Sequence, residues 1–182
     1  MTPPDTYAGW STCLEVFERA SEDEAVMQAM NAGSLSWTGG VANLFSERVS
    51  GVVNQRLTRI ANDISRDLRF AGDHGVLANA MLNARHKLAL LHRFSRCAPF
   101  PQALSELVQS QVRGYAEQAQ QSLEDTARSD RSGQLATIVR NNSLLRYADQ
   151  TTASQPVVDR AVAQRANATD TAGNRRRRTF LS

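Results

Sequence analysis

The longest regular pattern of apolar positions runs from Val41 to Phe70. Large apolar side chains recur there at steps of three to five residues, while charged and amide side chains fall mostly on other faces. This spacing predicts an amphipathic α-helix, and the thirty residues would make a rod about 45 Å long. The apolar stripe of this helix consists of Val41, Phe45, Val49, Val52, Leu57, Ile60, Ile64 and Leu68.

Helical spacing also occupies most of the chain before and after this stretch, up to about Tyr147. Residues 6–30 are expected to form one helix or two joined helices, and Ser21 and Glu24 have the spacing of a capping box that would start the second. Two further helices are predicted over 77–96 and 102–127, and a shorter one ends near Tyr147. The apolar stripe of the second of these begins with Leu104, Val108, Val112 and Tyr115.

Prolines and glycines separate the predicted helices. The five prolines stand at positions 3, 4, 99, 101 and 156, and proline is poorly tolerated inside a helix. Hinges are expected near residues 33–40, 72–75, 99–101 and 129–133. We therefore predict an all-α domain over residues 1–148, built as an antiparallel helical bundle or as elongated coiled-coil-like helices. Because the apolar stripes are narrow, partner helices are expected to come partly from other copies of the chain.

The composition changes after residue 148. Residues 149–182 are rich in Thr, Ala, Gln and Asn, which predicts a mostly disordered, flexible tail. The last twelve residues hold four of the 21 basic residues of the chain and none of its 18 acidic ones, so the rest of the chain is close to neutral. This basic cluster would bind phosphate groups of nucleic acid or of an anionic surface, serve as a signal, or only keep the terminus in solution. It consists of Arg175, Arg176, Arg177 and Arg178.

Residues with catalytic or ligating chemistry are few and scattered. The three histidines, His74, His86 and His92, lack the spacing of metal ligands and are expected at the surface or in loops. Cys13 and Cys97 form no CxxC pair, and free thiols fit a reducing compartment, although one disulfide is also open to them. No glycine-rich phosphate loop occurs either. We therefore expect no enzyme activity, no metal and no cofactor.

The hydropathy of the chain bears on its location. No window of 18 or more apolar residues occurs, so no transmembrane segment is expected. The residues at the beginning of the sequence lack the basic and apolar regions of a secretory signal. These features, together with the cysteine content, favour a cytoplasmic location.

One segment resembles a known family. Residues 94–118, FSRCAPFPQALSELVQSQVRGYAEQ, are similar to the centre of bacterial phasins, which coat polyhydroxyalkanoate storage granules, and the likeness extends to about residue 127. In both, a short break precedes a helix that begins with an Ala-Leu…Gln pattern and later carries an aromatic residue followed by small and polar ones. The resemblance implies a coat in which apolar stripes face the polyester or a partner helix.

Three functions remain open at this point. The first is a non-enzymatic amphipathic protein that self-associates and binds an apolar surface or partner helices, for example as a phasin-like coat. The second is a bacterial accessory or secreted protein with a helical protein-binding domain and an arginine-rich C-terminal signal. The third is an architectural protein that binds nucleic acid without sequence specificity.

The first function assigns binding to the two apolar stripes, from Val41 to Leu68 and from Leu104 to Tyr115. Large aliphatic side chains contribute about 1.5–3 kcal/mol each when they are buried, so a few of them suffice for firm adhesion. Four aromatic residues near the predicted helix ends would either fill the core or, if they are partly exposed, anchor a partner. These residues are Trp10, Trp37, Phe45 and Phe100.

Overall fold

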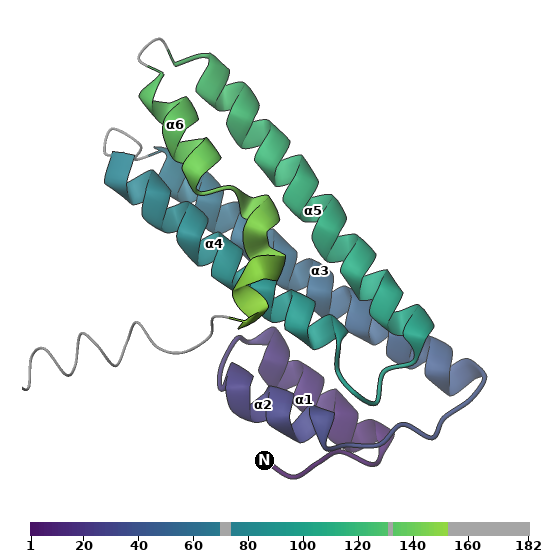
Figure 1. Ribbon diagram of the computed structural model, residues 1–182. Coiled ribbons are helices and arrows are strands. Elements are labelled where there is room, and N and C mark those ends of the chain that lie inside the picture. Colours follow the sequence, from purple (N-terminus) through teal and green to yellow (C-terminus); the bar gives the residue numbers. More distant parts are fainter. Residues whose placement is uncertain (70–73, 131–132, 153–182) are drawn as a thin grey trace, which may run out of the picture. The chain divides into compact units, whose positions relative to one another are not determined.

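The computed structural model describes residues 1–69, 74–130 and 133–152, and these residues form an all-α fold without strands, as predicted (Figure 1). They belong almost entirely to the first of two units, Met1–Thr151. The six α-helices and one 3₁₀-helix of this part of the chain are α1 (Tyr7–Glu18), α2 (Asp23–Asn31), α3 (Gly40–Arg69), α4 (His74–Ser95), α5 (Gln102–Arg128), α6 (Gln134–Asn141) and η1 (Leu144–Thr152).

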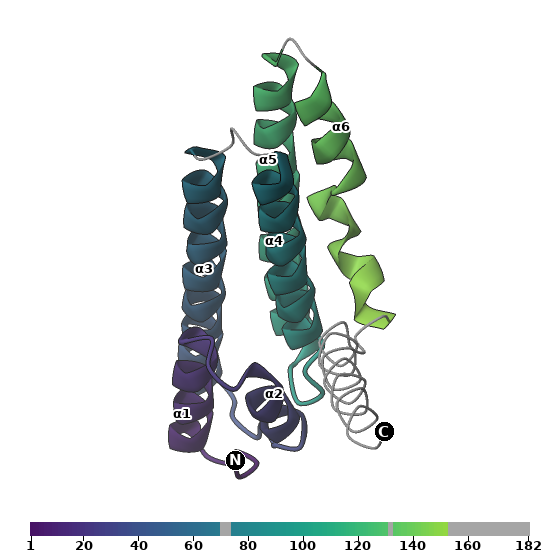
Figure 2. The same cartoon turned by 90° about the vertical axis from the view of Figure 1, so that its left-hand side faces the viewer.

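Three long helices, α3, α4 and α5, lie side by side and form the centre of the bundle (Figure 2). Helices α3 and α4 run antiparallel, and Lys87 of α4 donates a hydrogen bond to Asp63 of α3 at 2.6 Å. Helix α5 reverses direction again and therefore runs parallel to α3, where Gln111 donates to Ser50 at 2.6 Å. The apolar stripes of all three helices turn inward and form one continuous core.

Aromatic side chains fill the junction between α1, α3 and the α4–α5 connection. Phe100, in the Pro-Phe-Pro break, is only 8% exposed, and its ring centroid lies 5.2 Å from that of Phe94 and 6.0 Å from that of Trp10. Trp10 also meets Phe45 edge-to-face at 5.5 Å. Such geometries add about 0.5–1.5 kcal/mol per pair beyond the burial of area. The break between α4 and α5 therefore contributes a side chain to the core.

Helices α1 and α2 cover one end of the seam between α3 and α4. Phe17 of α1 stacks on Phe94 of α4 with ring centroids 4.4 Å apart. Glu24 of α2 accepts hydrogen bonds from Arg93 of α4 at 3.0 and 3.1 Å. The short helices are thus held by α4 as well as by α3.

Arg56 of α3 is the only arginine that the described residues bury, and its side chain ties α1 and α2 to α3. Its guanidinium donates to both carboxylate oxygens of Asp23, at 2.7 and 3.0 Å, and to the backbone oxygen of Phe17 at 2.6 Å. The same group lies 4.2 Å from the centre of the Phe17 ring, which adds a cation–π contact. A buried guanidinium needs such a complete set of partners, because an unpaired buried charge is costly.

Helix α6 and η1 cover the second seam, between α4 and α5. Helix α6 contacts both of these helices. The buried side-chain oxygen of Gln120 on α5 accepts a hydrogen bond from the backbone N–H of Leu144 at 2.9 Å. In η1, Tyr147 places its ring edge-to-face against His92 of α4 at 5.5 Å.

Two local predictions were wrong. No side chain caps α2 as the Ser21–Glu24 capping box required: Glu22 is the N-cap, in the left-handed conformation at φ 55°. Ala20, at φ 56°, shares this conformation, so the chain makes a tight turn that brings Asp23 to Arg56. The shorter helix predicted up to Tyr147 ends at Asn141 and resumes as η1, because the Leu144 amide is bound by Gln120 instead of by the preceding helical turn.

Replacing Asp23 by alanine should destabilise the protein strongly, since the buried Arg56 guanidinium then loses its carboxylate partner. The expected loss in free energy of unfolding is about 3 kcal/mol, measured by urea denaturation. Asp125→Ala is the matched control, because Asp125 pairs with Arg128 on the surface, where an ion pair contributes at most about 1 kcal/mol. Equal losses in the two variants would contradict the central role of Arg56.

Candidate functional site

Most residues of the two predicted binding stripes lie inside the protein. On α3, Leu68 is half-buried and Val41 is 44% exposed. The other stripe residues of this helix are at most 6% exposed: Phe45, Val49, Val52, Leu57, Ile60 and Ile64. On α5, Leu104, Val108 and Val112 are buried and Tyr115 is half-buried. These side chains pack against the chain's own helices. Most of them could touch an outside surface only if the helices separated.

The structure brings three of the predicted residues together at a groove. Ile64 and Leu68 of α3 and Tyr115 of α5 line a depression of about 320 Å³ between the two helices. Its remaining lining residues are Ala61, Ser65, Gln118, Ala119, Ser122 and Leu123. We call this depression the α3–α5 groove.

The groove follows from the order of the helices. Helices α1 and α2 cover one end of the α3–α4 seam, and a small polar depression beside Asp63 and Lys87 stays open farther along it. The α4–α5 seam is covered by α6 and η1. Within the described ranges no further helix packs over the α3–α5 seam. At the beginning of that seam Gln111 bridges to Ser50 and Asn54, at 2.6 and 3.3 Å, so the groove opens only beyond this polar link.

The groove combines an apolar floor with an uncharged polar rim. Exposed Ser65, Gln118 and Ser122 stand at the rim, while Ile64 and Leu123 form the floor. Burial raises the pKa of Tyr115 to about 12, so its phenol stays neutral at physiological pH. Because no lining residue carries a charge, covering the groove requires little desolvation of ions.

A second exposed apolar feature lies at the other end of α3. Val41 is 44% exposed and Leu44 is 58% exposed, and we call these two side chains the apolar knob. Trp37, in the connection between α2 and α3, is half-buried, and its ring centroid lies 5.6 Å from that of Tyr7. Of the four aromatic anchors considered, Trp10, Phe45 and Phe100 are core residues, and Trp37 alone keeps some exposure.

The histidines and the described acidic residues form no metal site. No group of three or more His, Cys, Asp or Glu side chains gathers in the described residues. His86 is exposed and the side chain of His74 lies outside the description, but His92 is buried, contrary to the expectation of a surface position. The reason is η1, whose Tyr147 packs over it.

Both cysteines are free and buried, not bridged by a disulfide. Burial raises the pKa of the Cys97 thiol to about 12, and it also raises the pKa of Cys13. Since the thiolate is the nucleophilic form, neither side chain is suited to nucleophilic catalysis.

Other sequence predictions concern residues outside the description. The arginine cluster, Arg175 to Arg178, lies there, as does most of the predicted tail and part of the hinge at 72–75.

Among the helices that the structure describes, none is long and apolar enough to cross a membrane. Comparison with known proteins finds no family model, no curated protein and no solved structure that matches this chain.

The sequence did not single out the rim of the groove. Ser65, Gln118 and Ser122 look like ordinary positions on a polar helix face, and only the parallel alignment of α3 and α5 brings them together. The small side chains Ala61 and Ala119 at the edges of the stripes were an available signal, because small residues let a depression form between helices.

The buried thiols should react very slowly in the folded protein. At pH 8 a disulfide reagent such as DTNB is expected to modify neither Cys13 nor Cys97 rapidly, and both should react at once after unfolding in urea. The reaction is followed by absorbance, with the Cys13→Ala and Cys97→Ala variants assigning each thiol. Rapid reaction of either thiol in the native protein would show that it is accessible.

His92 should make stability depend on pH. Burial, together with the positive charges of Arg96 and Arg113, holds the pKa of His92 below its usual value of 6.5. The folded state therefore binds fewer protons at this site than the unfolded chain, and the free energy of unfolding should fall as the pH drops below 6.5. The fall should be smaller in His92→Leu than in the wild type, as measured by urea denaturation at several pH values. His86→Leu, on the same helix, controls for the loss of a histidine.

Proposed function

We propose that this chain is a non-enzymatic helical protein that associates with further copies of itself, the apolar knob of one copy docking in the α3–α5 groove of the next. The observation that carries the proposal is the α3–α5 groove itself, an apolar depression with an uncharged rim, over which no further helix packs within the described ranges. The knob offers a partner of matching chemistry on the same chain.

The geometry of the groove suits one turn of a helix. Residues 61–68 of α3 span about two turns, or about 10 Å. Val41 and Leu44 stand three residues apart and so project from one side of α3, which is the pattern by which helices insert side chains into apolar grooves. Burying each of them would contribute about 1.5–3 kcal/mol.

The charges near the groove favour a protein partner over nucleic acid. Close to Gln118 and Ser122, the exposed surface of α5 carries Gln121, Thr126 and the acidic Asp125. The exposed arginines near the groove, Arg66 and Arg128, are each paired with aspartates of their own helix, so they form no basic cluster of the kind on which nucleic-acid binding depends.

The knob and the groove lie on different parts of α3, so the proposed contact is head-to-tail. A dimer of this type has a free knob at one end and a free groove at the other, so further copies add to form open chains, or rings where the two ends meet. Assembly of this kind is compatible with a surface coat. The granule-coating role that the phasin resemblance implies would then use exposed side chains outside the knob, such as Tyr7, Leu107 and Leu145, while the buried stripes hold the bundle together.

The test is a mixing experiment with one variant of each surface. Leu44→Glu should disable the knob and Ser122→Arg should block the groove, each weakening self-association about tenfold or more. An equimolar mixture of the two should recover a dimer and no larger species, because one intact knob meets one intact groove. Analytical ultracentrifugation over a range of concentrations measures all four samples, including the wild type.

Two exposed residues provide matched controls. Leu82→Glu changes an exposed leucine on α4, and Ser110→Arg changes an exposed serine on α5 outside the groove, so both should assemble like the wild type. A wild-type protein that stays monomeric at about 1 mM, or a mixture that stays monomeric, would overturn the proposal.

A further inference from the structure

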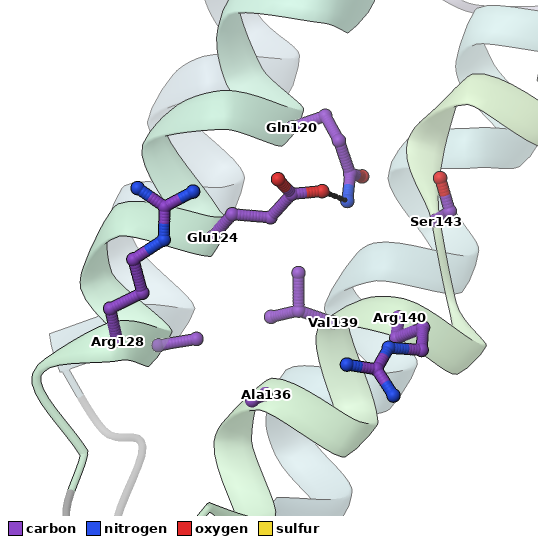
Figure 3. Close-up of a pocket in the computed structure, with 8 residues that line it drawn as sticks. Gln120, Glu124, Arg128, Ala136, Val139, Arg140 and Ser143 are labelled. Carbon is purple, nitrogen blue, oxygen red and sulfur yellow. Dashed lines mark hydrogen bonds between the residues drawn. The ribbon is translucent and has the colours of Figure 1, made fainter.

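A cavity with charged side chains in its lining lies between α5 and α6 (Figure 3). It is separate from the α3–α5 groove. Its volume is about 360 Å³, within the range of small-molecule sites. Val139 and Ala136 of α6 and Ala127 of α5 give it an apolar floor. Two arginines, one glutamate and one serine also line it, so both signs of charge face a small apolar space.

Both signs of charge line this cavity, with Glu124 and Arg128 on the α5 wall and Arg140 on the α6 wall. Glu124 belongs to α5, whereas Arg140 belongs to α6 and Ser143 to the segment that follows it (Figure 3). No ion pair joins Glu124 to Arg140 in the part of the chain that the structure describes. The two charges therefore line the same cavity without forming an ion pair with each other.

Glu124 is held in place by a buried neighbour. Gln120, only 4% exposed, donates a hydrogen bond to one Glu124 carboxylate oxygen at 2.8 Å and accepts one from the Leu144 N–H at 2.9 Å. The amide of Gln120 therefore links the acidic wall to the chain that leaves α6. Arg128, on the α5 wall, already pairs with Asp125 at 2.9 Å.

These charges select for a ligand with both signs. A simple carboxylate would meet the fixed Glu124, and a simple amine would meet Arg140, so either ion alone gains one partner and one repulsion. A zwitterion satisfies both walls, with its ammonium toward Glu124 and its carboxylate toward Arg140 and the Ser143 hydroxyl. The floor of Ala136 and Val139 then suits a short aliphatic side chain.

We propose that the cavity between α5 and α6 binds a small α-amino acid with an aliphatic side chain. Arg140 and Ser143 bind its carboxylate, Glu124 binds its ammonium group, and Val139 contacts its side chain. The site is independent of self-association, because it shares no lining residue with the α3–α5 groove.

The ligand preference is tested by titrating the full-length protein with L-valine, isovalerate and isobutylamine and recording NMR chemical shifts. Saturable binding of L-valine, with isovalerate and isobutylamine each at least about tenfold weaker, is the expected result. Absence of saturable binding of L-valine at about 10 mM would overturn the proposal. Isovalerate binding as tightly as L-valine would also overturn it, since the cavity would then be a simple anion site.

Two conservative variants test the walls of the cavity. Arg140→Gln and Glu124→Gln should each weaken L-valine binding about tenfold or more, because each removes one charged partner while keeping a polar side chain. Arg113→Gln, which changes an exposed arginine of α5 outside the cavity, should bind L-valine as the wild type does. Unchanged affinity in both cavity variants, with circular dichroism confirming their helical fold, would place the bound amino acid elsewhere and refute the site.

Discussion

The arrangement of this protein depends on one constraint: the apolar stripe of α3 extends along a thirty-residue helix and needs cover over its whole length. Helices α4 and α5 provide most of it, and two connections that reverse the chain place α5 parallel to α3. Three central helices have three outer seams, and in the described residues one is covered by α6 and η1, one is covered at one end by α1 and α2, and the α3–α5 seam has no covering helix. The α3–α5 groove is the third seam, so it results directly from the topology of the bundle.

Polar groups inside the bundle are satisfied by specific partners, and these partners join its layers. Arg56 connects α3 to both short N-terminal helices, and Gln120 connects α5 to the beginning of η1. Each bond is directional, unlike the apolar contacts around it, and so each fixes where a covering helix sits along the seam. Burial of apolar area provides the driving force for packing, and these polar side chains determine its register.

The sequence was sufficient for the regular part of this fold and insufficient for the contacts between its helices. Periodicity placed the long helix within a residue of its ends, because its stripe is continuous from Val41 to Leu68. It failed at η1 and at the start of α2, where Gln120 and Arg56 bind distant backbone or carboxylate groups that no local pattern records. The stripes also supplied Ile64, Leu68 and Tyr115 of the groove, but their proximity depends on the parallel alignment of α3 and α5.

The stacking of Phe17 on Phe94 has a consequence for the order of folding. The contacts of α3 with α4 and of α4 with α5 join helices that follow each other directly in the sequence, so they close small loops. The contact of α1 with the end of α4, by contrast, requires α3 and α4 to be in place first, because the two rings stand on helices at opposite ends of a long chain segment. Loop-closure entropy makes such distant contacts form late. The central hairpins should therefore assemble early, and docking of the two N-terminal helices should complete the native state.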